Sequence, residues 1–360
     1  RRAGRHGDQG IARLNDATPQ PQPVNPMPAE PEKTHVARDL KYGKPLIACR
    51  FDPTGKAVFA GAEDDTVQRW DLAADPAQVK PVSYNAHDGW PFALGVSPDG
   101  RTLLTGGTDG KLIWWPATGD APRPIRSLAA HQGWVRAIAF APDGARFATC
   151  GNDRKVRVWS LADGEQVLEL PGHDRPVFRV AFTTDGAHLV SADLKGLVIQ
   201  WDARAGKEER RFDASKLYHY NAGQGVDYGG VRDLALSRDG TFLACSGQIN
   251  ASNPLGAVSN AALVVLDWKT GELKQLQHLK EGVAGVAWGV RFHPEGFLIA
   301  SSGGTGGGFL WFTKPDQANE FFKLALPNSV RDLDLHPDGL QIATAHHDGV
   351  VRLSLMKAKA

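Results

Sequence analysis

The stretch HQGWVRAIAFAPDGARFATCGNDRKVRVWS, residues 131–160, decides the fold of this 360-residue chain. It contains an alternating run over residues 135–140, the turn Pro142-Asp143-Gly144 and a second run over residues 146–149. Short alternating runs connected by a glycine-containing turn are typical of β-hairpins. The stretch ends near Trp159, fifteen residues after Gly144.

Both the turn and the tryptophan recur along the chain. The corresponding glycines lie 45, 44, 42, 54, 56 and 43 residues apart, at Gly55, Gly100, Gly144, Gly186, Gly240, Gly296 and Gly339. The tryptophans that follow fifteen residues later are Trp70, Trp115, Trp159, Trp201 and Trp311. In the fifth unit we expect Trp268 to take this position after a 13-residue insertion, and in the seventh Ser354 replaces it. Seven copies with one internal offset predict an all-β repeat fold, which fits the 40 glycines and 10 tryptophans.

Composition and charge exclude several classes of protein. The 42% hydrophobic content supports a large core, and 41 basic against 40 acidic residues provide no global field for nucleic acid or an anionic membrane. No run of about 18 apolar residues could span a bilayer. The three cysteines form neither a disulfide framework nor a metal-ligand pair. We therefore expect no nucleic-acid binding, no membrane insertion, no metal and no other cofactor.

Three further positions repeat together with the tryptophan. A histidine stands nine residues before the end of the first strand, a hydroxyl residue ten before the tryptophan, and an aspartate six before it. The second unit supplies His87, Thr105, Asp109 and Trp115, and the third supplies His131, Thr149, Asp153 and Trp159. With a period near 44 residues and closing Trp-Asp pairs at 70–71 and 201–202, the pattern resembles the WD40-repeat family over residues 34–356.

This resemblance implies a seven-bladed β-propeller, with four strands in each blade around a central channel. It also implies that the four repeated residues form a buried hydrogen-bonded tetrad. We interpret the tetrad as structural rather than catalytic, because a buried Trp N–H or imidazole without a partner costs about 1–3 kcal/mol. The fourth unit has Lys195 in place of the aspartate, and the fifth to seventh units lack the histidine, so we expect these blades to be less rigid. We expect His346-His347 in a solvated turn.

The two ends of the sequence predict how the propeller closes. The seventh unit contains only three strands, and a blade without a fourth strand has an open edge. Residues 34–40 are the remaining strand-like segment, and we predict that they close this blade, as the family's closure also implies. Residues 1–33 are Pro-rich and polar, so we predict an extended tail or linker there and a propeller over residues 34–360.

Aromatic and arginine residues recur at the start of each first strand, which the family places on the face that carries partners. The residues five after the histidine position are Ile47, Phe92, Arg136, Phe178, Arg232, Trp288 and Arg331, one in each unit from the first to the seventh. In the second and third units a further aromatic residue, Trp90 or Trp134, stands two residues before this position. Such residues are typical of interface hot spots. Two alternatives stay open: the rings pack between blades, or Arg232-Asp233 and Arg331-Asp332 pair locally.

Two insertions in the fifth unit, residues 212–228 and 248–260, fall on the same face by topology. The first carries Tyr218 and Tyr220 among glycines and predicts an adaptable contact surface, since long loops on a rigid scaffold often carry function. A neutral surface insertion is the alternative.

Together these features predict a non-enzymatic scaffold that binds a partner protein or peptide on this face, within a multi-protein complex. Arginines there favour acidic groups on the partner. Two alternatives stay open: a structural subunit anchored by the Pro-rich tail, and a lactonase- or lyase-like enzyme with converging carboxylates or histidines in the channel. The chain begins Arg1-Arg2 rather than with Met, as a processed form or a fragment would. No signal peptide is visible, which favours the cytoplasm, although a processed chain also fits an extracytoplasmic location.

Overall fold

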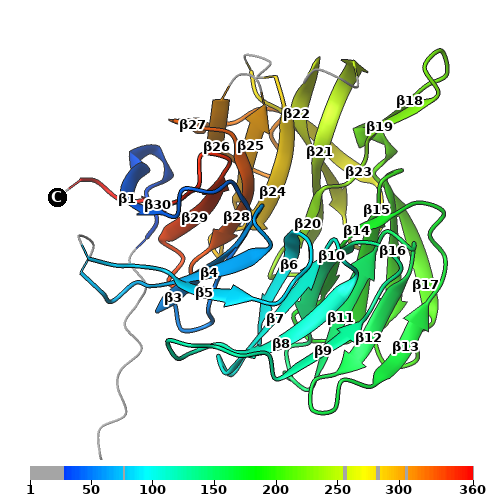
Figure 1. The fold of residues 1–360 in the computed structure, drawn as a ribbon. Helices are drawn as coiled ribbons and strands as arrows, with labels where there is room; N and C mark the ends of the chain where they lie inside the picture. The colour runs from blue at the N-terminus through cyan, green and yellow to red at the C-terminus, as the bar shows by residue number, and fades with distance from the viewer. Residues whose placement is uncertain (1–27, 76–77, 254–257, 281–283, 305–306, 360) are drawn as a thin grey trace, which may run out of the picture.

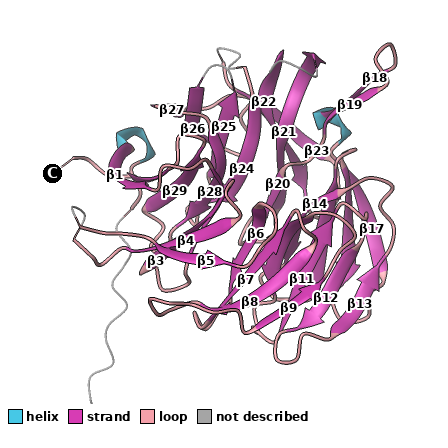
Figure 2. Cartoon of the chain, in the orientation of Figure 1, coloured by secondary structure: helices cyan, strands magenta, loops and turns pink. Residues whose placement is uncertain are grey.

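A computed structural model describes residues 28–75, 78–253, 258–280, 284–304 and 307–359 of the chain. These residues form seven four-stranded antiparallel sheets, arranged as the blades of a β-propeller (Figure 1). Helix is confined to two single 3-10 turns, η1 (Pro31–Lys33) and η2 (Ser215–Leu217), and the rest of the described fold is strand and loop (Figure 2). The prediction of an all-β, seven-bladed propeller is confirmed.

The first four blades follow the chain in order, each running from an inner to an outer strand. Blade 1 contains β2 (Leu46–Phe51), β3 (Ala57–Ala62), β4 (Thr66–Asp71) and β5 (Val82–Asn85). Blade 2 contains β6 (Pro91–Val96), β7 (Thr102–Gly107), β8 (Lys111–Pro116) and β9 (Arg126–Ala129). Blade 3 contains β10 (Val135–Phe140), β11 (Arg146–Gly151), β12 (Val156–Ser160) and β13 (Gln166–Leu170). Blade 4 contains β14 (Val177–Phe182), β15 (His188–Asp193), β16 (Leu197–Asp202) and β17 (Glu208–Asp213).

The remaining blades include the insertions and the closure. A separate hairpin, β18 (Tyr218–Asn221) and β19 (Val226–Gly229), precedes blade 5, which contains β20 (Asp233–Leu236), β21 (Phe242–Asn253), β22 (Val258–Asp267) and β23 (Leu273–His278). Blade 6 contains β24 (Val286–Phe292), β25 (Leu298–Gly304), β26 (Gly307–Thr313) and β27 (Phe322–Leu326). Blade 7 contains β28 (Val330–Leu335), β29 (Gln341–His346), β30 (Val350–Leu355) and the N-terminal strand β1 (His35–Lys41).

The repeated turn glycines lie between the first two strands of each blade and have φ angles from 68 to 91°. Only glycine adopts this left-handed conformation without a steric cost, which explains why the sequence repeats it. The apolar residues of the strands then pack between neighbouring blades. Trp115 of blade 2, for example, shares one buried cluster with Phe59, Val67 and Tyr84 of blade 1.

Two of the expected tryptophan positions are wrong. In blade 5, Leu266 pairs with Leu243 as Trp159 pairs with Phe147, whereas Trp268 lies beyond β22 and stacks on Phe212. The β21–β22 ladder keeps one register from Phe242 opposite Asp267 to Ile249 opposite Asn260, and the inserted residues extend this hairpin instead of displacing Leu266, so counting to the next tryptophan overshoots.

In blade 6 the spacing is right but the register differs. The turn is one residue shorter, because Phe292 pairs with Leu298 where Phe140 pairs with Phe147. Trp311 consequently lies opposite Ala300 and has no hydrogen-bond partner for its indole N–H among the described residues.

The last blade takes its outer strand from the N-terminus. β1 pairs antiparallel with β30 from His35 opposite Leu355 to Lys41 opposite Val350. Just before β1, the backbone N–H of Glu30 donates to the carbonyl of Met356 (2.9 Å), and Ala29 packs against the cluster between blades 6 and 7. Residues 28–33 of the predicted tail therefore lie against the propeller, while residues 1–27 fall outside the described part of the chain.

The repeated polar residues form hydrogen-bonded sets inside blades 2 and 3. Trp115 Nε1 donates to Thr105 Oγ1 (2.9 Å), which lies 2.7 Å from His87 Nε2, and His87 Nδ1 lies 3.1 Å from Asp109. Blade 3 repeats this geometry with equivalent distances of 2.8 Å between its members, Trp159, Thr149, His131 and Asp153. These sets join the third strand to the second and to the segment before the first.

Blade 4 also contains a complete set, but its aspartate comes from a different position than in blades 2 and 3. Asp193, two residues before Lys195, lies 2.8 Å from His173 Nδ1 and is buried. The same carboxylate accepts the backbone N–H groups of Lys195 and Leu197, at 2.8 and 3.1 Å, and so fixes the turn. The expectation that Lys195 leaves this blade without its aspartate is therefore wrong.

In blade 7, which lacks the repeated histidine, a histidine of the second strand contacts the repeated hydroxyl residue instead. His346 is fully buried, its Nε2 lies 2.8 Å from Thr344 Oγ1, and its Nδ1 lies 3.0 Å from the carbonyl oxygen of Asn328. The prediction of a solvated turn at this histidine is wrong. Burial lowers the pKa of His346 to about 4, so the side chain is neutral near pH 7.

Candidate functional site

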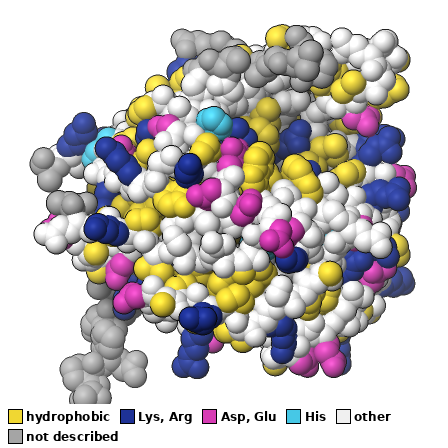
Figure 3. Space-filling view, in the orientation of Figure 1, with side chains coloured by type: hydrophobic (Ala, Val, Ile, Leu, Met, Phe, Trp, Pro, Cys, Tyr) yellow, Lys and Arg dark blue, Asp and Glu magenta, His cyan; other side chains and the backbone are white. Residues whose placement is uncertain are grey.

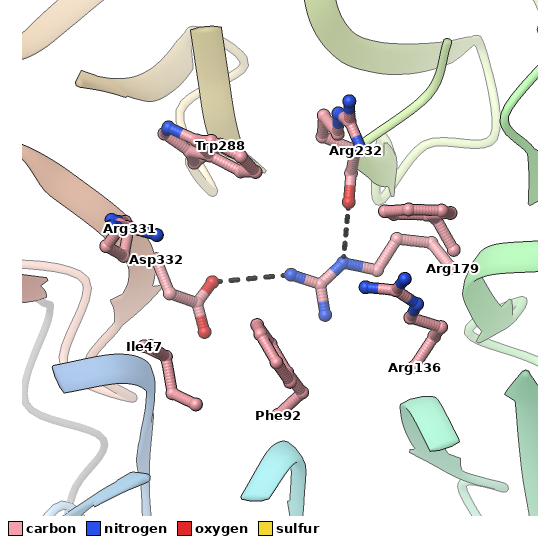
Figure 4. A pocket seen from close by; sticks show the side chains of 9 residues that line it. Ile47, Phe92, Arg136, Arg179, Arg232, Trp288, Arg331 and Asp332 are labelled. Atoms are coloured by element: carbon pink, nitrogen blue, oxygen red, sulfur yellow. Dashed lines mark hydrogen bonds and ion pairs between the residues drawn. The ribbon is translucent and has the colours of Figure 1, made fainter. Parts of the chain in front are cut away.

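One end of the central channel opens into a pocket of about 70 Å³, which we call the mouth pocket (Figure 4). Its lining side chains are Ile47, Phe92, Arg136, Phe178, Arg179, Arg232, Trp288, Arg331 and Asp332. All seven residues that the sequence places five after the histidine position are among them. Residues from all seven blades therefore meet at this one mouth.

β-Bulges direct these side chains toward the channel. The register of the first two strands shifts between Val135 and Ala137, so that Arg136 is the residue left out of the ladder. The same shift leaves out Ile47, Phe92, Phe178, Trp288 and Arg331 in their blades. A bulge re-aims one side chain and increases the local twist. The repeat therefore presents one variable residue per blade at the channel mouth.

The aromatic and arginine side chains of five blades form a continuous row. We call it the aromatic–arginine row, and in order its members are Trp90, Phe92, Trp134, Arg136, Phe178, Arg232 and Trp288. Phe92 stacks on Trp134 with ring centroids 5.2 Å apart, and the Arg136 guanidinium lies 4.0 Å from the Trp134 centroid and 4.3 Å from that of Phe178. The Arg232 guanidinium lies 4.8 Å from Phe178 and 5.5 Å from Trp288.

The rings are partly exposed rather than packed away between blades. Trp90 is 39% exposed, and the other aromatic members are intermediate in burial. Trp90 and Trp134 do not line the mouth pocket itself, but their stacking contacts connect them to Phe92. The row thus extends from the pocket across blades 2 and 3 as one continuous surface.

The arginines of the row have no carboxylate partner among the described residues. Arg136 donates through Nε to Asn152 Oδ1 (2.7 Å), and Arg232 Nε is buried without a partner. Burial lowers the pKa of both guanidinium groups to about 10, and Arg232 adds to the effect on Arg136. Both groups remain cationic near pH 7.

The local pairing considered for the row does not occur. Asp233 binds Arg179 (3.0 Å) and Arg291 (2.7 Å), while Asp332 binds Arg50 (2.8 Å) and Arg179 (3.4 Å). Each aspartate thus pairs with arginines of other blades rather than with the arginine before it.

These aspartates belong to an ion network below the mouth pocket, which sequence reasoning missed. Its members come from blades 1, 4, 5, 6 and 7 and are Arg50, Arg179, Arg291, Asp233, Asp332 and Asp334. Arg179 also donates through Nε to the carbonyl oxygen of Arg232 (3.0 Å), as Figure 4 shows. The network holds the pocket floor and joins blades across the channel. Its sequence signal is weak: charged residues stand one or three positions after the row position, in some units only.

The network carboxylates are already used by backbone groups and arginines. Asp332 accepts the backbone N–H of Cys49 (3.0 Å), Asp334 that of Phe51 (3.0 Å), and Asp233 that of Val290 (3.1 Å). Burial alone would raise the pKa of Asp233, but the cations Arg179 and Arg291 lower it. The three carboxylates are therefore already bound, and they tie the inner strand of blade 7 to that of blade 1 and the inner strand of blade 5 to that of blade 6.

The described part of the chain contains neither a cluster of metal-ligating side chains nor a membrane-spanning helix. Among these residues no cluster of three or more His, Cys, Asp or Glu side chains could hold a metal ion. No helix among them is long and apolar enough to cross a membrane. The space-filling view shows basic, acidic and hydrophobic side chains interspersed over one side of the molecule (Figure 3).

The described parts of the fifth-unit insertions, the β18–β19 hairpin and the adjoining ends of β21 and β22, lie at the upper end of the view in Figure 1. β18 and β19 pair from Tyr218 opposite Gly229 to Asn221 opposite Val226. Tyr218 donates to Asp227 (2.5 Å), which also pairs with Arg175 of blade 4 (3.5 Å). Tyr220 is 51% exposed. Neither tyrosine lines the mouth pocket, so this hairpin is a separate surface.

Comparison with known sequences matches four segments of the chain to one repeat family. The sequence profile of the WD domain, G-beta repeat, matches residues 79–116, 122–160, 164–202 and 323–353. Each matched segment runs through the outer strand of one blade and ends in the third strand of the next. The unmatched stretches include the inserted blade 5 and the register-shifted blade 6.

A similar curated protein is protein groucho of Drosophila melanogaster. The two sequences are 28% identical over 188 residues, which cover 51% of this chain and 26% of that protein. The chain thus matches about a quarter of the relative's length.

Proposed function

Because the chain carries WD40 repeats and folds as a seven-bladed β-propeller, we propose that it is a non-catalytic scaffold for protein interactions. The partner is a protein or peptide segment that lies across the aromatic–arginine row and the mouth pocket. The observation that carries this proposal is the convergence of one side chain from each blade, six of them at β-bulges, on a single partly exposed surface.

The chemistry of the row supports a protein partner. Tryptophan and arginine are the residue types enriched at interface hot spots, and they contribute most where rings are already held in place. Here the stacks among Phe92, Trp134 and Arg136 hold the side chains before a partner arrives. Less conformational entropy is then lost on binding.

The fifth-blade hairpins supply a second contact area for a larger partner. Tyr218 and Tyr220 lie on β18, and exposed Val258 begins β22. A short peptide would use the row alone, whereas a folded partner would reach both surfaces and join the chain to a multi-protein complex.

The two alternative functions have less support. An enzyme in the channel would need a free carboxylate or histidine, but the network aspartates are bound by arginines and backbone N–H groups. A structural subunit anchored by its tail would depend on residues 1–33, of which residues 1–27 lie outside the described part of the chain.

Affinity capture tests the proposal. The wild-type chain and the double variant Trp134→Ala/Arg136→Ala would serve as baits, with Arg101→Ala/Ile125→Ala as a matched control, because Arg101 and Ile125 are exposed away from the row. We expect specific partners to be lost from the row variant and retained by the control. Identical partner lists for all three baits would contradict the proposal, and substrate turnover by the pure chain would contradict its non-catalytic part.

A further inference from the structure

We infer that the mouth pocket is a socket for one carboxylate group of the partner, which enters between Arg136 and Arg232 beside the ring of Phe178. This inference rests on the proposed function and goes beyond it by naming the group that the site recognises. The same chemistry occurs in an Asp or Glu side chain and in the C-terminus of a chain.

Charge balance is the first argument. Arg136 and Arg232 lie at the same pocket and against the same ring, yet no described carboxylate pairs with either. The two nearest candidates in sequence, Asp233 and Asp332, are occupied by Arg50, Arg179 and Arg291. Two partly desolvated cations that repel each other are costly, and an anion from the partner would remove that cost.

The fixed orientation of the guanidinium groups is the second argument. Arg136 rests between Trp134 and Phe178 and uses its Nε on Asn152, which leaves its terminal nitrogens available. Arg232 lies between Phe178 and Trp288, and its Nε has no partner. Held in this way, the N–H groups are pre-organised for charge-assisted hydrogen bonds, which carboxylates accept from arginine with high directionality.

The size and lining of the pocket select a small monoanion. A cavity of about 70 Å³ accepts a group of a few atoms. Ile47, Phe92, Phe178 and Trp288 line it beside four arginines and Asp332, whose carboxylate is bound by Arg50 and Arg179. A phosphate dianion carries more charge and loses more hydration in such surroundings. The aliphatic atoms next to a carboxylate, by contrast, fit the apolar walls.

Peptide selection on the full chain tests the inference. One pool of random dodecapeptides carries a blocked C-terminus and a second pool carries a free one, which distinguishes side-chain from terminal carboxylates. Both pools are selected on the wild type, on Arg136→Gln/Arg232→Gln, on Trp288→Ala and on the exposed control Arg101→Gln/Arg123→Gln. Circular dichroism and the unfolding temperature verify that each variant is folded.

We expect the wild type and the control to enrich peptides with Asp or Glu at one position, or with a free C-terminus. Replacing that carboxylate by its amide should weaken binding to the wild type at least about tenfold, and this ratio should fall to about one on Arg136→Gln/Arg232→Gln. Two results would overturn the socket and leave the proposed function intact. In the first, the enriched peptides lose binding on Trp288→Ala but require no carboxylate. In the second, inorganic phosphate displaces the bound peptides and acetate does not. Enrichment of no peptide, or of peptides indifferent to all variants, would overturn both.

Discussion

In each of blades 2, 3 and 4, one buried hydroxyl group links the tryptophan of the third strand to the histidine before the first strand. Thr149 Oγ1 lies 2.8 Å from both Trp159 Nε1 and His131 Nε2, and the second imidazole nitrogen lies 2.8 Å from Asp153. One arrangement satisfies every group: Trp159 donates to Thr149, Thr149 donates to His131, and His131 donates to Asp153. Because all members except the aspartate are buried, a missing partner cannot be replaced by water.

Replacing Thr149 by valine keeps the shape and removes the hydroxyl. The indole N–H of Trp159 and one imidazole nitrogen then lose their partners, so we expect the free energy of unfolding to fall by about 2–3 kcal/mol. Urea unfolding measures this loss. Thr118→Val, at an exposed position, is the control and should change it by less than about 0.5 kcal/mol. Equal effects of the two substitutions would contradict a structural role for the set.

The aspartate of blade 4 can be tested against its neighbour. Asp193→Ala removes the partner of His173 and the acceptor for two backbone N–H groups, and we expect it to cost about 2–4 kcal/mol in unfolding free energy. Lys195→Ala, at an exposed side chain, should cost less than about 0.5 kcal/mol. A larger loss of unfolding free energy for Lys195→Ala than for Asp193→Ala would contradict the role of Asp193 in this set.

His346 predicts a pH dependence. Burial lowers its pKa from 6.5 to about 4, so between these values the unfolded chain binds a proton that the folded chain does not. The unfolding free energy should therefore fall as the pH drops from 6.5 to 4, by on the order of 3 kcal/mol from this group alone. His346→Gln keeps a polar group at Thr344 without titrating. Urea unfolding at several pH values should show a shallower loss for the variant, and parallel curves would disprove the assignment.

At the scale of elements, sequence reasoning succeeded where structure follows from local repetition. The offset from Gly144 to Trp159 defines a hairpin and a third strand, and the bulge at Arg136 recurs because its flanking pattern recurs. It failed where an element departs from the period, as at Trp268 after the extended β21–β22 hairpin. The pairing of Arg179 with Asp332 across the channel could not be predicted from the sequence. These residues are 153 positions apart, and only the closed geometry of the whole ring brings them together.

The N-terminal strand makes an element-scale prediction. β1 supplies the outer ladder of blade 7, and Leu40 is buried in the cluster between blades 7 and 1. Deleting residues 34–40 exposes the edge of β30 and opens that cluster, so we expect cooperative thermal unfolding to be lost. A synthetic peptide of residues 34–41 should restore it at least in part, and a scrambled peptide should not. An unchanged melting transition after deletion would refute closure by this strand.

At the scale of the whole molecule, the propeller is a rigid ring that presents one variable position per blade at the channel mouth. The ion network fixes the floor beneath that surface. With nearly equal numbers of basic and acidic residues, no overall field selects a partner, and we propose that recognition depends on the local row of rings and arginines.

Site-specific photocrosslinking tests this account most directly. A photoreactive phenylalanine analogue would replace Phe178 in the mouth pocket, Ile125 on the exposed rim, or Asp143 in an exposed turn between the first two strands of blade 3, each in the full chain within its native extract. The account predicts that a captured partner crosslinks through position 178 and not through positions 125 or 143. Crosslinking of the same partner through position 125 or 143 alone, with position 178 silent, would contradict it.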